Sequence, residues 1–189
     1  GALIVVDLGS DLRPEDFLYS GTNIEAQLST DLLINLFATD TPLHDGAVLV
    51  KGNKIISAGV ILPLSRQGIS RYGTRHLAAL GITERFDRCI CIVVSEETGT
   101  LSLANQGKLE RPITSSRLQE LLVNLIGNQN SIGSSKTSLN KIKIIIHNLT
   151  SSPKSGININ PQNADKTNSL SARGSKKIPS FETYLYFLA

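Results

Sequence analysis

Apolar runs of strand length alternate with helix-period patterns along residues 1–126, and this alternation constrains the fold more than any other feature of the chain. Residues 2–8 (ALIVVDL) are almost continuously apolar, which is typical of a strand covered on both faces. In residues 29–38, four apolar side chains fall on one helical face, behind a serine that can cap the helix. This interleaving predicts an α/β domain with a mixed central β-sheet flanked by helices.

The rest of this region continues the alternation. Residues 47–51 and 54–62 predict a hairpin, because Gly52-Asn53 suits a two-residue turn that begins with glycine. Further predicted elements are a loop or short helical turn at 10–20, a helix capped by Thr74 and running toward Phe86, a strand pair at 88–95 and 100–104, and an amphipathic helix at 114–126.

Residues 127–189 differ in composition from the rest of the chain. Asn and Ser supply 19 of these 63 residues, and 8 Lys+Arg stand against 2 Asp+Glu, whereas residues 1–126 carry 11 against 14. Such a stretch buries too little apolar surface to offset the entropy of ordering, so we predict one domain over 1–126 and a polar, basic, mostly disordered tail over 127–189. The tail could contact nucleic acid or an anionic membrane, but its basic residues are not interleaved with aromatics, and we expect no nucleic-acid partner.

Cys89 and Cys91 lie two positions apart in a strand-like run and therefore face the same side of a sheet. We interpret them as buried, reduced thiols in a reducing compartment; a metal pair would lack a second cysteine pair. No stretch approaches the roughly 18 apolar residues of a membrane span. The chain begins inside a predicted strand, so we expect its natural start to be truncated.

Two polar motifs carry the chemistry of the predicted domain. Residues 41–47 (TPLHDGA) bring an imidazole, a carboxylate and a glycine to the start of an apolar strand. Residues 72–76 (YGTRH) bring a hydroxyl, a guanidinium and a second imidazole to a helix start. His44 and Asp45 could hold a divalent cation, Gly46 lets a sugar approach the backbone, and the second motif suits phosphate oxygens. Together the motifs predict a nucleotide site, although each residue taken singly has a commoner structural interpretation.

Four blocks in order, TPLHDGAVLV, ILPLS, GTRHLAALGITE and IVVSEETGTLSLANQGKL, resemble the catalytic domain of the diadenylate cyclases. These enzymes make cyclic di-AMP from two ATP molecules, and the likeness covers residues 1 to about 126. The resemblance implies ATP as substrate and a homodimer in which two chains meet face to face, each supplying half of the site. It also implies a cytoplasmic domain of a membrane-anchored bacterial protein, tethered through a missing N-terminal segment.

The resemblance also implies roles for single residues. Asp45 would activate the ribose 3′-hydroxyl directly or through the metal, with His44 as a metal ligand. The remaining implied contacts are Gly46 and Ala47 on the ribose, Thr74, Arg75 and His76 on the triphosphate with a hydroxyl from Ser95, Glu96 in the metal shell, and Leu62 and Ile24 on adenine. An oxygen-rich site suits Mg²⁺ or Mn²⁺, and the imidazole favours Mn²⁺.

Two positions depart from the family pattern. Relatives commonly have arginine where this chain has Leu77, so either a phosphate contact is missing or Leu77 faces the core. Ile61 replaces an aromatic residue that often stacks near adenine.

Three other functions remain open at the level of sequence. One is a non-catalytic nucleotide-binding regulatory module. The second is a metal-dependent nucleotide hydrolase that uses His44 and Asp45. The third is an interaction domain whose basic tail binds nucleic acid.

Overall fold

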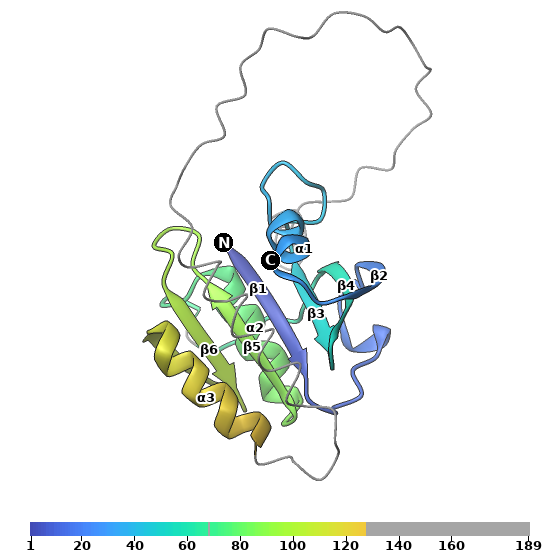
Figure 1. Cartoon of the computed structure of the whole chain (residues 1–189). Coiled ribbons are helices and arrows are strands. Elements are labelled where there is room, and N and C mark those ends of the chain that lie inside the picture. Colours follow the sequence, from blue (N-terminus) through green and yellow to red (C-terminus); the bar gives the residue numbers. More distant parts are fainter. Residues whose placement is uncertain (68, 128–189) are drawn as a thin grey trace, which may run out of the picture.

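The computed structural model describes residues 1–67 and 69–127, with side chains described to residue 125, and these residues form a central sheet with helices on both faces (Figure 1). The predicted disordered tail at 127–189 falls almost entirely outside the described residues. The elements in chain order are β1 (Ala2–Asp7), the 3-10 turn η1 (Pro14–Asp16), β2 (Thr22–Gln27), α1 (Thr30–Leu36), β3 (Ala47–Lys51), β4 (Lys54–Val60), α2 (Thr74–Arg85), β5 (Cys89–Val94), β6 (Leu101–Asn105), β7 (Lys108–Ile113) and α3 (Ser115–Gly127).

Within the described residues the strands form one seven-stranded sheet in the order β2-β4-β3-β1-β5-β6-β7. The central strands β1 and β3 run parallel, and the other neighbours are antiparallel. The predicted mixed α/β architecture is therefore confirmed. Because β5 runs antiparallel to β1, the starts of β1 and β3 and the end of β5 lie at the same end of the sheet.

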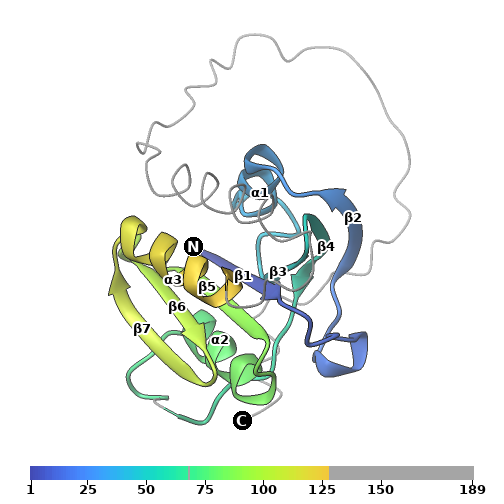
Figure 2. The ribbon, with the colours of Figure 1, turned by 60° about the horizontal axis from the view of Figure 1, so that its bottom comes forward.

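Two apolar clusters, one on each face of the sheet, explain the continuous apolar run of β1. Leu3 and Val5 pack with α2, whereas Ile4 and Val6 pack with α1 and α3. Figure 1 and Figure 2 show α2 and α3 on opposite sides of the sheet. Cys89 and Cys91 are free, buried and both on the α2 face, as predicted.

Most predicted elements are confirmed, one helix start is corrected, and the edge strands β2 and β7 were not predicted. Ser29 caps α1, since its Oγ accepts a hydrogen bond from the Leu32 amide at 3.2 Å. The turn between β3 and β4 places Gly52 at φ +57°, a conformation that glycine adopts without strain. The predicted cap at Thr74 is wrong: Gly73 is the cap of α2, and Thr74 is its first helical residue.

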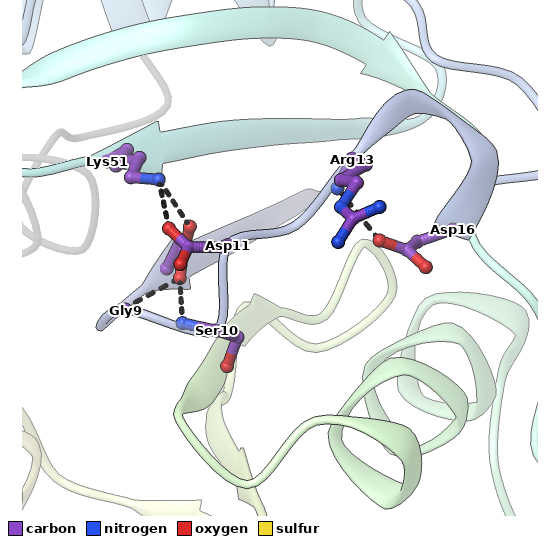
Figure 3. Close-up of polar contacts among 7 residues, drawn as sticks. Gly9, Ser10, Asp11, Arg13, Asp16 and Lys51 are labelled. Carbon is purple, nitrogen blue, oxygen red and sulfur yellow. Dashed lines mark hydrogen bonds and ion pairs between the residues drawn. The ribbon is translucent and has the colours of Figure 1, made fainter.

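A charged cluster lies at the opposite end of the sheet, where β1 and β3 end (Figure 3). The Asp7 side chain is 2% exposed. Its Oδ1 accepts hydrogen bonds from the amides of Gly9 at 2.8 Å and Ser10 at 2.7 Å. Lys51 Nζ lies 3.5 Å from Asp7 Oδ2 and 3.0 Å from Asp11 Oδ1. The lysine therefore neutralises a buried carboxylate that turns the chain after β1.

The described helices do not include one with the length and apolar character that crossing a bilayer requires.

Candidate functional site

The two predicted motifs meet at the end of the sheet where β1 and β3 begin and β5 ends. Residues 44–46 lead directly into β3, and Ser95 and Glu96 follow β5. The start of α2 lies at the same end of the sheet, as shown by the 2.5 Å distance between Arg75 Nη1 and Glu96 Oε2. Segments far apart in sequence thus bring an imidazole, two carboxylates and a guanidinium to one place.

Gly46 is required by the packing of β3 against β4. Its φ is +113°, and a Cβ at this position would lie 2.8 Å from the backbone carbon of Gly59. Any larger residue would push the two strands apart. The side chain of Ala47 is completely buried, so of the predicted ribose contacts these two residues can offer only backbone atoms.

The ring orientation of His44 follows from one hydrogen bond. Its Nδ1 lies 2.6 Å from the carbonyl oxygen of Thr41. A carbonyl can only accept, so Nδ1 carries the proton and donates. In the neutral ring, Nε2 is then left with a lone pair, which is the form in which histidine binds a metal.

Arg75 and Glu96 form the closest charged pair of the site. The Arg75 side chain is 22% exposed and that of Glu96 is 62% exposed. The hydrogen bond and charge of Arg75 lower the pKa of Glu96, and His44 contributes a smaller electrostatic effect in the same direction. Glu96 is therefore ionised at neutral pH and lies within electrostatic range of His44.

His76 is held against the sheet. It is 7% exposed, and its Nε2 lies 3.1 Å from the hydroxyl oxygen of Ser102 on β6. Burial, with a smaller effect from the charge of Arg111, lowers the pKa of His76 below its ordinary value. The ring is therefore neutral at pH 7 and brings no positive charge to the start of α2.

Ser95 and Thr74, which were both predicted to contact the triphosphate, have different surroundings. The Ser95 hydroxyl accepts a hydrogen bond from the Thr98 amide at 3.3 Å and so helps to close the turn after β5. Thr74 is half-buried in the first turn of α2, which has no acidic residue. Leu77 is 8% exposed, which confirms the reading that it faces the core.

The two residues predicted to contact adenine are not brought together. Leu62 is 1% exposed and packs on the α2 face of the sheet, whereas Ile24 is half-buried and packs on the α1 face. Ile61 pairs instead with Tyr19 in an isolated β-bridge, and Tyr19 is 36% exposed. The sequence pattern gave no signal for Tyr19, since this contact depends on how the segment before β2 continues along β4.

The donor atoms fit a divalent cation that is shared with a nucleotide. In the part of the chain that the structure describes, no group of three or more His, Cys, Asp or Glu side chains is placed to hold a metal by itself. Mg²⁺ in nucleotide enzymes commonly takes one or two protein carboxylates and completes its shell with phosphate oxygens and water. The free Nε2 of His44 and the ionised Glu96 supply such a partial set.

Comparison with known proteins places the chain in a family. Residues 1–109 match the DAC family, described as DisA bacterial checkpoint controller nucleotide-binding. A diadenylate cyclase of Listeria monocytogenes is 48% identical over 125 residues, covering 65% of this chain and 45% of the relative. A cyclic di-AMP synthase of Bacillus subtilis is 44% identical over 124 residues, covering 65% of this chain and 44% of the relative. The chain thus spans a little under half the length of these curated relatives.

Solved structures agree with this assignment. The crystal structure of a double mutant of DacA from Staphylococcus aureus matches with a TM-score of 0.60 and 39% identity, covering 66% of this chain and 83% of that one. A hypothetical membrane spanning protein from Bacillus cereus matches with a TM-score of 0.54 and 44% identity, covering 60% of this chain and 55% of that one. The sequence blocks, the fold and the matched residues agree, and the chain belongs to the DAC domain family of diadenylate cyclases.

Proposed function

We propose that this chain is a diadenylate cyclase domain that condenses two ATP molecules into cyclic di-AMP and releases two pyrophosphates. One observation carries the proposal beyond family membership: the contact between Arg75 and Glu96 joins the start of α2 to the end of β5, beside the loop that holds His44 and Asp45. A triphosphate needs cationic donors and a cation-binding carboxylate at adjacent positions. The site supplies both.

The reaction consists of two nucleotidyl transfers. Each 3′-hydroxyl attacks the α-phosphorus of the other ATP, and pyrophosphate leaves in line. Positioning and charge neutralisation provide most of the catalysis in such transfers. Asp45 is the proposed acceptor of the hydroxyl proton, and the Gly46 and Ala47 backbone positions the ribose.

The triphosphate lies against the start of α2 in this proposal. Arg75 provides the charge-assisted contact, and Thr74 and Ser95 provide hydroxyls. The neutral ring of His76 acts as a hydrogen-bonding group rather than as a counter-charge. The first-turn amides of α2, beyond a glycine cap without a side chain, favour a bound anion.

A divalent cation, Mn²⁺ or Mg²⁺, would be held by His44 Nε2, Asp45 and Glu96. When bound, it supplies charge neutralisation of the phosphate oxygens. Adenine recognition is assigned to Ile24 through its side chain, whereas the buried Leu62 offers only its backbone.

Two chains meeting face to face would complete the reaction centre, each holding one ATP. We further propose that residues 1–126 form the catalytic domain, that 127–189 is an appended basic tail, and that the parent protein is membrane-anchored. The membrane-spanning description of the Bacillus cereus relative supports the last point.

Product identity tests the proposed reaction. The chain is incubated with ATP and Mn²⁺, the nucleotides are resolved by chromatography, and Asp45→Asn serves as the matched variant. We expect cyclic di-AMP from the unchanged chain and none from the variant. ADP or AMP as the product would instead identify a hydrolase. Bound ATP without turnover at any protein concentration would identify a regulatory module.

A further inference from the structure

Arg111, a residue of the edge strand β7, reaches the start of α2. Its guanidinium carbon lies 5.5 Å from the centroid of the Tyr72 ring. The Tyr72 ring centroid in turn lies 6.4 Å from that of His76. A guanidinium at this distance from an aromatic face is attracted by the ring, so Tyr72 holds the arginine beside the helix start.

The sheet topology explains how a distant strand places its charge there. β7 pairs with β6, with Leu101 opposite Ile113 and Leu103 opposite Glu110, and the register shifts between these pairs. Arg111 therefore lies opposite the irregular stretch around Ser102, whose hydroxyl contacts His76. Helix α2 packs against both strands.

The first turn of α2 itself has little free positive charge, although the exposed Arg71 precedes its cap. Arg75 is paired with Glu96, His76 is neutral, and Leu77 is buried. Arg111 is exposed, and no carboxylate pairs with it among residues 1–67 and 69–127. Its charge nevertheless reaches His76, because it contributes to the lowered pKa of that ring.

The His76 ring has a second nitrogen, Nδ1, near the cap of α2. His76 is 7% exposed and uses Nε2 to contact Ser102. Its Nδ1 would lie 3.9 Å from a Cβ built on Gly73, the cap of α2. Within the described part of the chain, this Nδ1 has no hydrogen-bond partner, and it is not among the buried unpaired polar atoms, so it is open to solvent at the start of α2. When the Ser102 hydroxyl donates to Nε2, the proton of the neutral ring is on Nδ1, which can then donate a hydrogen bond to an anion at the helix start.

We propose that Arg111, held over Tyr72, is a further phosphate-binding residue of this site and contacts the terminal phosphates of ATP and the departing pyrophosphate. The proposal rests on the proposed function. The order of the sheet supports the terminal position. Asp45 precedes β3 and Glu96 follows β5, whereas Ser102 and Arg111 lie on β6 and β7, which come next after β5 toward the edge of the sheet. The planar guanidinium can bind two phosphate oxygens at once. It would supply the cation that the buried Leu77 does not.

Binding of ATP, AMP and inorganic pyrophosphate to the full chain, measured by calorimetry, tests this role. For Arg111→Ala we expect ATP and pyrophosphate binding to weaken by roughly 10- to 100-fold, the loss of one charge-assisted contact, with AMP binding changed less than about twofold. Arg111→Lys should lie between Arg111→Ala and the unchanged chain. Lys108→Ala, which removes an exposed charge from the other end of β7, should bind all three as the unchanged chain does.

The outcomes separate this inference from the function on which it rests. Equal ATP binding by Arg111→Ala and the unchanged chain would overturn the role of Arg111 and leave the cyclase proposal intact. An equal loss of ATP and AMP affinity would also overturn it, since the effect would then be structural. A failure of the unchanged chain to bind ATP would overturn both. Arg111 is exposed, so its removal should leave the thermal unfolding midpoint nearly unchanged.

Discussion

Arg75 and Glu96 have different proposed partners, phosphate and metal, yet in this structure they neutralise each other. Glu96 holds the guanidinium at 2.5 Å, and the triphosphate and the cation would have to separate them. Binding of ATP through Arg75 therefore requires this ion pair to break. Triphosphate alone gains little from an arginine that is already paired, whereas a cation that occupies Glu96 frees Arg75 for phosphate.

Glu96→Gln tests this requirement. The variant removes the carboxylate charge, so we expect metal-free ATP binding to strengthen by roughly two- to fivefold, the range for an exposed ion pair, and the gain on adding Mn²⁺ to shrink. Equilibrium binding of ATP in chelator and in Mn²⁺ measures both effects. Glu97→Gln, at the neighbouring exposed position, is the control. Weaker metal-free binding by Glu96→Gln would contradict the prediction.

His76 predicts the pH dependence of stability. Burial and Arg111 hold its pKa below the ordinary value of 6.5. Below that value the unfolded chain binds a proton that the folded chain does not, so the free energy of unfolding rises with pH. This stability is present above 6.5 and is lost as the pH falls through it. Urea denaturation between about pH 7.5 and 5.5 should therefore show a steeper loss for the unchanged chain than for His76→Gln. Parallel slopes would show that His76 does not titrate differently in the two states.

At the scale of elements, the turn after β1 depends on a buried carboxylate. Asp7→Ala leaves the amides of Gly9 and Ser10 without their acceptor and removes the buried partner of Lys51. We expect the free energy of unfolding to fall by about 2–4 kcal/mol, from two lost hydrogen bonds at a partly buried turn. Urea denaturation measures the loss. Asp11→Ala removes the exposed partner of the same lysine and should have a much smaller effect; equal losses would contradict the assigned role of Asp7.

The elements that could be predicted are those whose sequence reflects two-sided burial. β1, β3 and β5 are apolar except for Asp7 and Lys51 at the ends of β1 and β3, because helices cover both faces of the sheet. The edge strands β2 (TNIEAQ) and β7 (KLERPI) gave no such signal, since edge strands carry polar residues and proline. Missing β7 also meant missing Arg111, whose contact with Tyr72 depends on strand order and not on sequence spacing.

The candidate site was predictable in part for the same reason. The stretches 44–46 and 74–76 directly adjoin a strand and a helix that could be predicted from the sequence. Their position at one end of the sheet therefore follows from the fold. The pairing of Arg75 with Glu96 and the burial of His76 and Leu62 depend on side-chain packing. Such packing cannot be inferred from a motif alone.

At the scale of the whole molecule, we propose that one chain holds half of a reaction centre. The residues proposed for metal and phosphate gather at one end of the sheet and at the start of α2, and in this proposal they hold one ATP rather than two. If one chain holds one ATP, turnover requires two chains, and its rate at low protein concentration follows the concentration of the dimer.

The most direct measurement is the initial rate of cyclic di-AMP formation from ATP and Mn²⁺ as a function of protein concentration. At concentrations below the dimerisation constant, we expect the rate to rise about fourfold for each doubling of protein, because dimer concentration varies with the square of the monomer concentration. Asp45→Asn, added in excess to the unchanged chain, should lower this rate by forming mixed pairs. Cyclic di-AMP formation strictly proportional to protein concentration and unaffected by added Asp45→Asn chain would contradict a site shared between two chains.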